Sequence, residues 1–257
     1  MSSSINARAF CKYRGGKWEV YTVCPPAEIL LTIVVNSKEL ISIVCSPDNM
    51  EQLTIGFLYN EGVITSIDEI KSLEVDTVNC VACVMLTKEQ FPKPHKLILT
   101  PGFGGGIIFS QEKMRKDIEM FLNIHPERLC FLMEEMKNNA VHYKRSGGIH
   151  ASAVCDDQGI VIQAEDVGRH NTMDKVMGEA LMKKISLQGK LMLTTGRISS
   201  EMILKASNMG IPIMASLSSP TTKAVDLARK TGIGLAGYVQ KDQFIAYANA
   251  DHFKDGD

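Results

Sequence analysis

Hydrophobic residues in the first half of the chain fall into short runs that predict a small sheet with one helix. The helix carries an apolar stripe at helical spacing; Ser46 is its predicted N-terminal cap, and Gly62 follows its predicted end. The turn Asn36-Ser37-Lys38 separates two runs rich in β-branched residues, which predicts a hairpin. The predicted strands are residues 28–35, 39–45, 75–86 and 96–100.

In the second half, helical and extended patterns alternate. The predicted elements are a helix at 126–138, a hairpin at 149–155 and 160–164, helices at 172–183, 199–209 and 220–230, and strands at 190–194, 211–216, 233–239 and 243–248. Such alternation predicts a mainly parallel sheet with helices on its faces. We therefore expect a small N-terminal α+β domain over residues 1–120 and a three-layer α/β domain of the cytidine-deaminase type over 121–257, with the boundary near 110–125.

The overall charge limits which classes of binding partner are expected. The chain is 45% hydrophobic, 22% charged and carries a formal net charge of −1, which gives no reason to expect duplex nucleic acid or an anionic membrane. No apolar run approaches the ~20 residues of a membrane helix, and the N-terminus lacks the apolar core of a signal peptide. With seven cysteines, an odd number, we expect reduced thiols and a cytoplasmic protein.

Candidate chemistry begins at a polar turn, residues 165–171, that joins a predicted strand to a predicted helix. Asn171 is a suitable helix cap, and Arg169 and His170 can donate hydrogen bonds to an anion at the carboxyl edge of the sheet. A purely structural alternative is that Asp166 and Arg169 pair with each other.

Two further turns have the same character. In the turn 194–200, Gly196 permits close approach of a ligand and Ser199 can cap the next helix, while the turn 216–220 is again polar. Together the turns predict a cradle for a phosphate-bearing ligand. The predicted binding residues are Asp166, Gly168, Arg169, His170, Asn171, Lys175, Thr195, Gly196, Arg197, Ser199 and Ser200.

Catalytic zinc is not expected, although the order of elements suits a deaminase. Zinc deaminases need H-x-E at one helix start and P-C-x-x-C at the next. Here His170 is followed by Asn171 and Thr172, and no cysteine occurs after Cys155.

The chain contains one C-x-x-C pair, Cys80 and Cys83. Within one continuous strand, residues three apart point to opposite faces, so the two thiols could not bind one metal ion. We therefore expect two buried, inert thiols unless the strand breaks at Asn79. The glycine-rich segment 100–106 has two open interpretations, a hinge between domains or a segment that approaches a bound ligand.

These motifs together resemble the FdhD/NarQ family of formate dehydrogenase accessory sulfurtransferases. The resemblance is carried by SGGIHASA at 146–153, EDVGRHNTMDK at 165–175, TGR at 195–197 with Glu201-Met202, GIP at 210–212, SSP at 218–220 and LTIGFLYNEG at 53–62. It covers most of the chain from Glu28 to Tyr247, and it implies a small N-terminal domain, a deaminase-like domain and a homodimer.

The resemblance also implies a cargo and a reaction. Such proteins bind the molybdenum cofactor in its bis-guanine-dinucleotide form and pass sulfur to it from a cysteine desulfurase before the cofactor enters formate dehydrogenase. The family carries this sulfur on a cysteine of the glycine-rich loop, where this chain has Phe103. If sulfur is transferred, Cys80 or Cys83 is the remaining candidate carrier. The alternatives are a non-catalytic chaperone for the cofactor and a nucleotide deaminase with unusual ligands.

Overall fold

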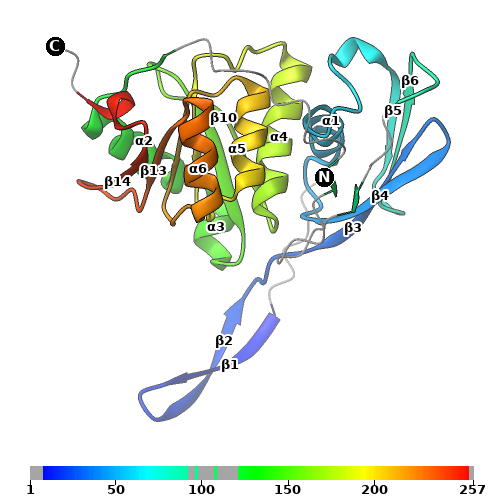
Figure 1. The fold of residues 1–257 in the computed structure, drawn as a ribbon. Helices are drawn as coiled ribbons and strands as arrows, with labels where there is room; N and C mark the ends of the chain where they lie inside the picture. The colour runs from blue at the N-terminus through cyan, green and yellow to red at the C-terminus, as the bar shows by residue number, and fades with distance from the viewer. Residues whose placement is uncertain (1–7, 92–95, 98–106, 109–120, 255–257) are drawn as a thin grey trace.

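The computed structural model describes residues 8–91, 96–97, 107–108 and 121–254. Within these residues, Figure 1 shows a protruding hairpin, a small sheet with one helix, and a larger unit in which helices cover a sheet. The chain is therefore a mixed α/β protein, as predicted. The glycine-rich segment and Phe103 lie outside the described residues, as does most of the predicted boundary region; β7 (Lys96–Leu97) pairs with β8 (Ile107–Ile108) between these gaps.

The small unit contains four strands in the order β4-β3-β6-β5. The predicted hairpin of β3 (Ile29–Val35) and β4 (Lys38–Cys45) is confirmed, and its turn places Asn36 and Ser37 in the left-handed backbone region. Helix α1 (Met50–Asn60) follows, and its buried residues join those of the sheet in one hydrophobic core. Gly62 comes after the end of this helix with a positive φ of 73°, which explains the choice of glycine.

The prediction of one strand over 75–86 is wrong. The structure has β5 (Ile70–Asp76) and β6 (Val81–Leu86), separated by a turn in which Asp76 Oδ1 accepts hydrogen bonds from the amides of Val78 and Asn79. Cys80 ends that turn with a φ of 55°. A carboxylate that satisfies two turn amides outweighs the β propensity of the neighbouring residues.

Prediction also failed at the start of α1. Helix α1 begins at Met50, after Asn49 in the left-handed conformation, and no side chain caps it. Ser46, the predicted cap, is instead buried against the larger unit.

The larger unit is built on a six-stranded sheet with the order β10-β9-β11-β12-β13-β14. Strands β11, β12 and β13 are parallel, whereas β9 is antiparallel to both of its neighbours, so β10 runs with β11. The sheet strands are β9 (His150–Cys155), β10 (Ile160–Asp166), β11 (Leu191–Thr194), β12 (Ile213–Ser216), β13 (Gly234–Gly237) and β14 (Ile245–Ala248).

Helices cover both faces of this sheet, which gives the predicted three layers (Figure 1). One face packs on α2 (Pro126–Asn139), and the other on α4 (Arg169–Lys183), α5 (Ser200–Met209) and α6 (Thr222–Thr231). The more specific likeness to deaminases stays a prediction. A short helix, α3 (Val141–Ser146), was not predicted, and α4 begins three residues before the predicted start.

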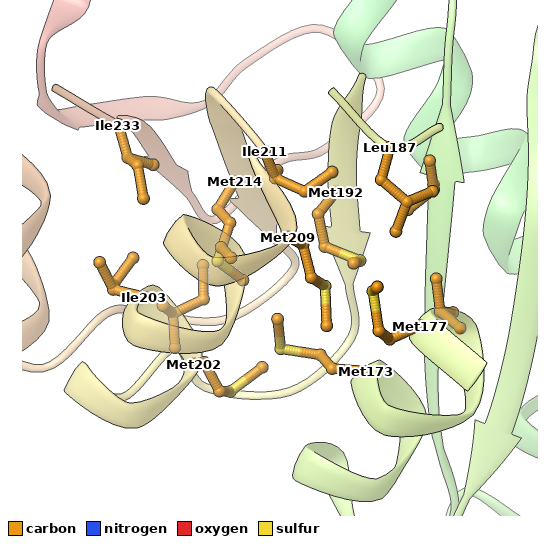
Figure 2. Close-up of a cluster of buried hydrophobic side chains, with 14 of the residues drawn as sticks. Met173, Met177, Leu187, Met192, Met202, Ile203, Met209, Ile211, Met214 and Ile233 are labelled. Atoms are coloured by element: carbon orange, nitrogen blue, oxygen red, sulfur yellow. The ribbon is translucent and has the colours of Figure 1, made fainter. Parts of the chain in front are cut away.

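Methionine is frequent in the core beneath α4 and α5. Figure 2 shows these thioethers between the helices and the strands, together with aliphatic side chains. The methionines labelled there are Met173, Met177, Met192, Met202, Met209 and Met214.

Two glycines allow the small unit to pack closely on the larger one. Helix α1 lies between the small sheet and α4 (Figure 1). A Cβ atom at Gly56 of α1 would lie 1.8 Å from the carbonyl oxygen of Asp174, and one at Gly178 of α4 would lie 1.9 Å from that of Gln52. The two helix backbones therefore touch where they cross, and no side chain fits at either glycine.

Among the described residues, no helix combines the length and the apolar character needed to cross a lipid bilayer.

Candidate anion-binding site

The predicted turns meet at one edge of the larger sheet. Because β10 and β11 both run parallel to β12, their carboxyl ends lie at this edge, and antiparallel β9 begins there. Thr195 joins two of these elements: its amide donates to the carbonyl of Ala151 at 2.9 Å, and its hydroxyl accepts from the Ala151 amide at 3.0 Å. The Nδ1 atom of His150 lies 3.4 Å from the same hydroxyl.

Gly196 lies where the two turns touch. A Cβ at this position would meet the Cβ of Arg169 at 2.9 Å and the Nδ1 of His150 at 3.1 Å. The glycine therefore brings the turn after β11 against the start of α4, as the predicted cradle requires.

A buried hydroxyl network supports both turns from below. The Ser152 hydroxyl lies 2.6 Å from that of Thr172 and donates to that of Thr194 at 3.1 Å. The Ser216 hydroxyl donates to the Gly196 carbonyl at 2.7 Å. Because these side chains are completely buried, they hold the turns in place and do not face a ligand.

Two arginines at this edge, Arg169 and Arg197, form no ion pair among the described residues, although the charge of Glu201 acts on Arg169. Arg197 is exposed, whereas Arg169 is half-buried and its Nε–H group is buried with no hydrogen-bond acceptor. Burial, and then the positive charge of Arg197, lower the pKa of Arg169. A buried guanidinium donor without an acceptor is costly, so an anionic ligand at this point would relieve both the desolvation and the repulsion.

His170 lies beside the second helix start. Its Nε2 atom is 3.1 Å from the Ser199 hydroxyl and 3.3 Å from a carboxylate oxygen of Glu201. Burial, followed by the nearby charge of Lys205, lowers the pKa of His170 to about 3. The ring is therefore neutral at physiological pH, and its contact with Glu201 is a hydrogen bond rather than an ion pair.

The first turns of α4 and α5 have no side-chain cap. Gly168 occupies the N-terminal cap position of α4 and has no side chain to cap it. Ser199 occupies that position in α5, but its hydroxyl contacts His170 instead of capping the helix. The prediction that Asn171 caps its helix is wrong: Asn171 lies inside the first turn of α4. Uncapped first-turn amides at the positive end of a helix dipole are suitable donors to an anion.

Asp166 and Lys175, two of the predicted binding residues, form a buried ion pair. The Lys175 Nζ atom is 2.7 Å from Asp166 Oδ2, both side chains are buried, and this carboxylate does not pair with Arg169 as the structural alternative supposed. Asp166 also accepts hydrogen bonds from the Gly168 amide, the Asn171 side chain and the Ser46 amide. Asp166, which was predicted to contact a ligand, therefore joins the small unit to the turn before α4.

The remaining predicted binding residues also divide into exposed and buried ones. Ser200 opens α5 and is partly exposed, whereas Thr195 and Gly196 are buried at the contact between the turns. The third turn does not start a helix at Pro220; it pairs with Ile198 of the second turn, and Thr221 caps α6. Glu201 was missed as a partner of His170, although its place in the first turn of a helix is an available signal.

The two candidate thiols lie in the small unit. Cys83 is exposed on β6 and Cys80 is partly exposed, so the prediction of two buried thiols is wrong, because the strand breaks at Asn79. Burial raises the pKa of Cys45 and Cys155 to about 12, which leaves these two thiols protonated at neutral pH.

Within the described ranges, no group of three or more histidine, cysteine, aspartate or glutamate side chains is arranged to hold a metal ion. The expectation of a zinc-free domain stays a prediction.

Comparison with known proteins gives consistent matches over nearly the whole chain. The model of the FdhD/NarQ family matches residues 26–254. The sulfur carrier protein FdhD of Bacillus subtilis (strain 168) is 33% identical over 235 residues, 89% of each chain, and that of Bacillus pumilus (strain SAFR-032) is 34% identical over 248 residues, 94% of this chain and 95% of its own. The crystal structure of a formate dehydrogenase accessory protein from Desulfotalea psychrophila has the same fold, with a TM-score of 0.78 at 22% identity, over 96% of this chain and 98% of its own.

Proposed function

Because the chain belongs to the FdhD/NarQ family, we propose that it is a sulfur carrier and accessory protein in formate dehydrogenase maturation. In this proposal the cargo is the molybdenum bis-guanine-dinucleotide cofactor, the sulfur donor is a cysteine desulfurase, and the recipient is the formate dehydrogenase catalytic subunit. The protein works in the cytoplasm as a homodimer.

The observation that carries cargo binding is the arginine pair between two uncapped helix starts. Arg169 and Arg197 form no ion pair among the described residues, and the Nε–H donor of Arg169 is buried without an acceptor. A guanine dinucleotide supplies a pyrophosphate, whose oxygens accept bidentate hydrogen bonds from arginine and single ones from helix amides. The edge lined by His170, Ser199 and Ser200 then contacts the rest of the nucleotide.

Sulfur transfer requires a thiol that can ionise. In the loading step, a thiolate of this protein attacks the outer sulfur of the desulfurase persulfide; that S–S bond breaks, a new one forms here, and the desulfurase leaves as a thiolate. The accessible thiols among the described residues are Cys11, Cys24, Cys80 and Cys83. Cys80 and Cys83 are the proposed carriers in place of a loop cysteine.

Guanosine diphosphate is expected to bind the wild-type protein, and Arg169→Ala is expected to weaken that binding by about 10- to 100-fold, since a hydrogen bond to a charged group contributes about 1.5–3 kcal/mol. Arg197→Ala should weaken it by a similar or smaller factor, because Arg197 is exposed. Isothermal titration calorimetry measures the effect.

Arg128→Ala is the matched control. Arg128 contacts Phe131 on α2, which covers the opposite face of the sheet, so its removal should leave the affinity unchanged. No binding by the wild-type protein, or equal affinity of all four proteins, would contradict the proposed site.

The carrier role predicts a persulfide on Cys80 or Cys83 after incubation with a cysteine desulfurase and cysteine. Peptide mass spectrometry should find 32 Da of added sulfur on one of these residues, and the Cys80→Ala/Cys83→Ala variant should lose it.

A cofactor chaperone without sulfur transfer is the second candidate, and Phe103 in the glycine-rich loop favours it. Its signature is guanosine diphosphate binding by a protein in which no cysteine acquires sulfur.

A further inference from the structure

The first two strands form a hairpin that projects from the rest of the molecule (Figure 1). Strands β1 (Arg8–Arg14) and β2 (Lys17–Val23) pair only with each other, and every residue of both strands except Val23 is exposed. The family match begins at residue 26, after this hairpin. Its role therefore does not follow from the site described above.

The strand register divides the hairpin into a charged face and an uncharged face. Residues directly opposite each other share a face, and faces alternate along each strand. All five charged residues fall on one face, together with Phe10, Tyr21 and Val23. The opposite face consists of Ala9, Cys11, Tyr13, Trp18, Val20 and Thr22.

The uncharged face has no cover within the described part of the chain. Trp18 is 71% exposed and Val20 is 79% exposed, and the Trp18 ring lies beside that of Tyr13, at 5.3 Å between centroids. An isolated two-stranded hairpin is marginally stable in water, so this one requires a surface to pack on.

Building on the homodimer of the proposed function, we propose that the hairpin is a dimerisation arm whose uncharged face packs on the second copy of this chain. The surface that packs on the uncharged face must be present whenever the chain is present, because the hairpin always needs it. A second copy of the chain is always present. A two-fold axis makes the exchange reciprocal, because each copy gives one arm and receives one.

Charge and area both fit this partner. The hairpin carries four cations and one carboxylate, a net charge of +3. Because the whole chain has a net charge of −1, the rest of the chain has a net charge of −4. The arm and the body of another copy therefore attract each other. With about 150–250 Å² for a buried aromatic side chain, one uncharged face buries about 400 Å². Two arms with their two docking surfaces then bury about 1,600 Å², the size of a stable interface.

The test compares Val20→Asp with Val78→Asp by sedimentation equilibrium of the full chain. Both valines are highly exposed on one copy, at 79% and 87%, but Val78 lies in the turn between β5 and β6. Wild type and Val78→Asp should sediment as dimers, whereas Val20→Asp should sediment as a monomer at the same concentration, because a carboxylate at the centre of the interface must be desolvated without a partner.

Trp18, the single tryptophan of the chain, reports the contact directly. Its fluorescence emission should move to longer wavelength in Val20→Asp and on dilution of the wild type, because the ring becomes exposed to water. A dimeric Val20→Asp variant would overturn the proposal. So would a wild-type monomer with solvent-exposed Trp18, but that result would also remove the homodimer from the proposed function, whereas a dimeric variant would leave the homodimer in place. Neither result depends on cofactor binding.

Discussion

Replacing Lys175 by methionine is expected to lower the free energy of unfolding by about 3–5 kcal/mol. The substitution leaves the Asp166 carboxylate buried without its cationic partner, and neither side chain can reach water from its present position. Thermal or urea unfolding measures the loss. Hydrogen exchange at the Ser46 amide, which donates to Asp166, should also accelerate, because this bond joins the small unit to the larger one.

Lys183→Met in the same helix is the matched control. Lys183 forms an exposed ion pair with Glu179, and an exposed pair of this kind contributes about 0.5 kcal/mol or less. Asp166→Asn combined with Lys175→Met should recover part of the stability, since it removes the unpaired charge but keeps a hydrogen-bond acceptor. Equal losses in Lys175→Met and Lys183→Met would show that the buried pair does not stabilise the junction.

Gly178→Ala is expected to destabilise the protein by about 3 kcal/mol or more, at the upper end of the range for overpacked cores. Helix propensity alone predicts the opposite sign, a gain of about 1 kcal/mol. The steric effect is larger here because the new methyl group would lie 1.9 Å from the carbonyl oxygen of Gln52, and a backbone carbonyl cannot move unless α1 and α4 separate.

The measurement is again the unfolding free energy, with Lys183→Ala as the exposed control in α4. Gly56→Ala should show a comparable loss, because it meets the carbonyl of Asp174 at the same crossing. A more stable Gly178→Ala variant would mean that the two helices are not in backbone contact.

The sequence was most informative where local chemistry determines local structure. The strand and helix order of the larger unit follows from alternating hydrophobic runs bounded by glycines, and most of these elements match the structure within three residues. The turns after β10 and β11 meet because the two strands run in the same direction on either side of antiparallel β9, and because Gly196 permits close approach. The sequence predicted that these turns share one edge of the sheet.

Predictions failed where a residue serves a distant segment. Ser46 and Asn171 have the side chains of helix caps, yet both bond to a segment more than a hundred residues away. The Ser46 hydroxyl accepts a hydrogen bond from the Val167 amide, and the Asn171 side chain donates one to the Val44 carbonyl. No local pattern reveals such a partner. The same applies to Gly56 and Gly178, which break helix propensity for the sake of a contact between two units.

The methionine layer under the site has a mechanical consequence. The helices whose first turns carry Arg169 and Ser200 pack on the sheet through a core in which the thioethers of Met173, Met202 and Met209 lie among aliphatic side chains (Figure 2). Unbranched methionine side chains change shape at little cost, whereas branched ones have few rotamers. We therefore expect the spacing between the two helix starts to adjust to cargo of different bulk more readily than it would over a core of branched side chains alone.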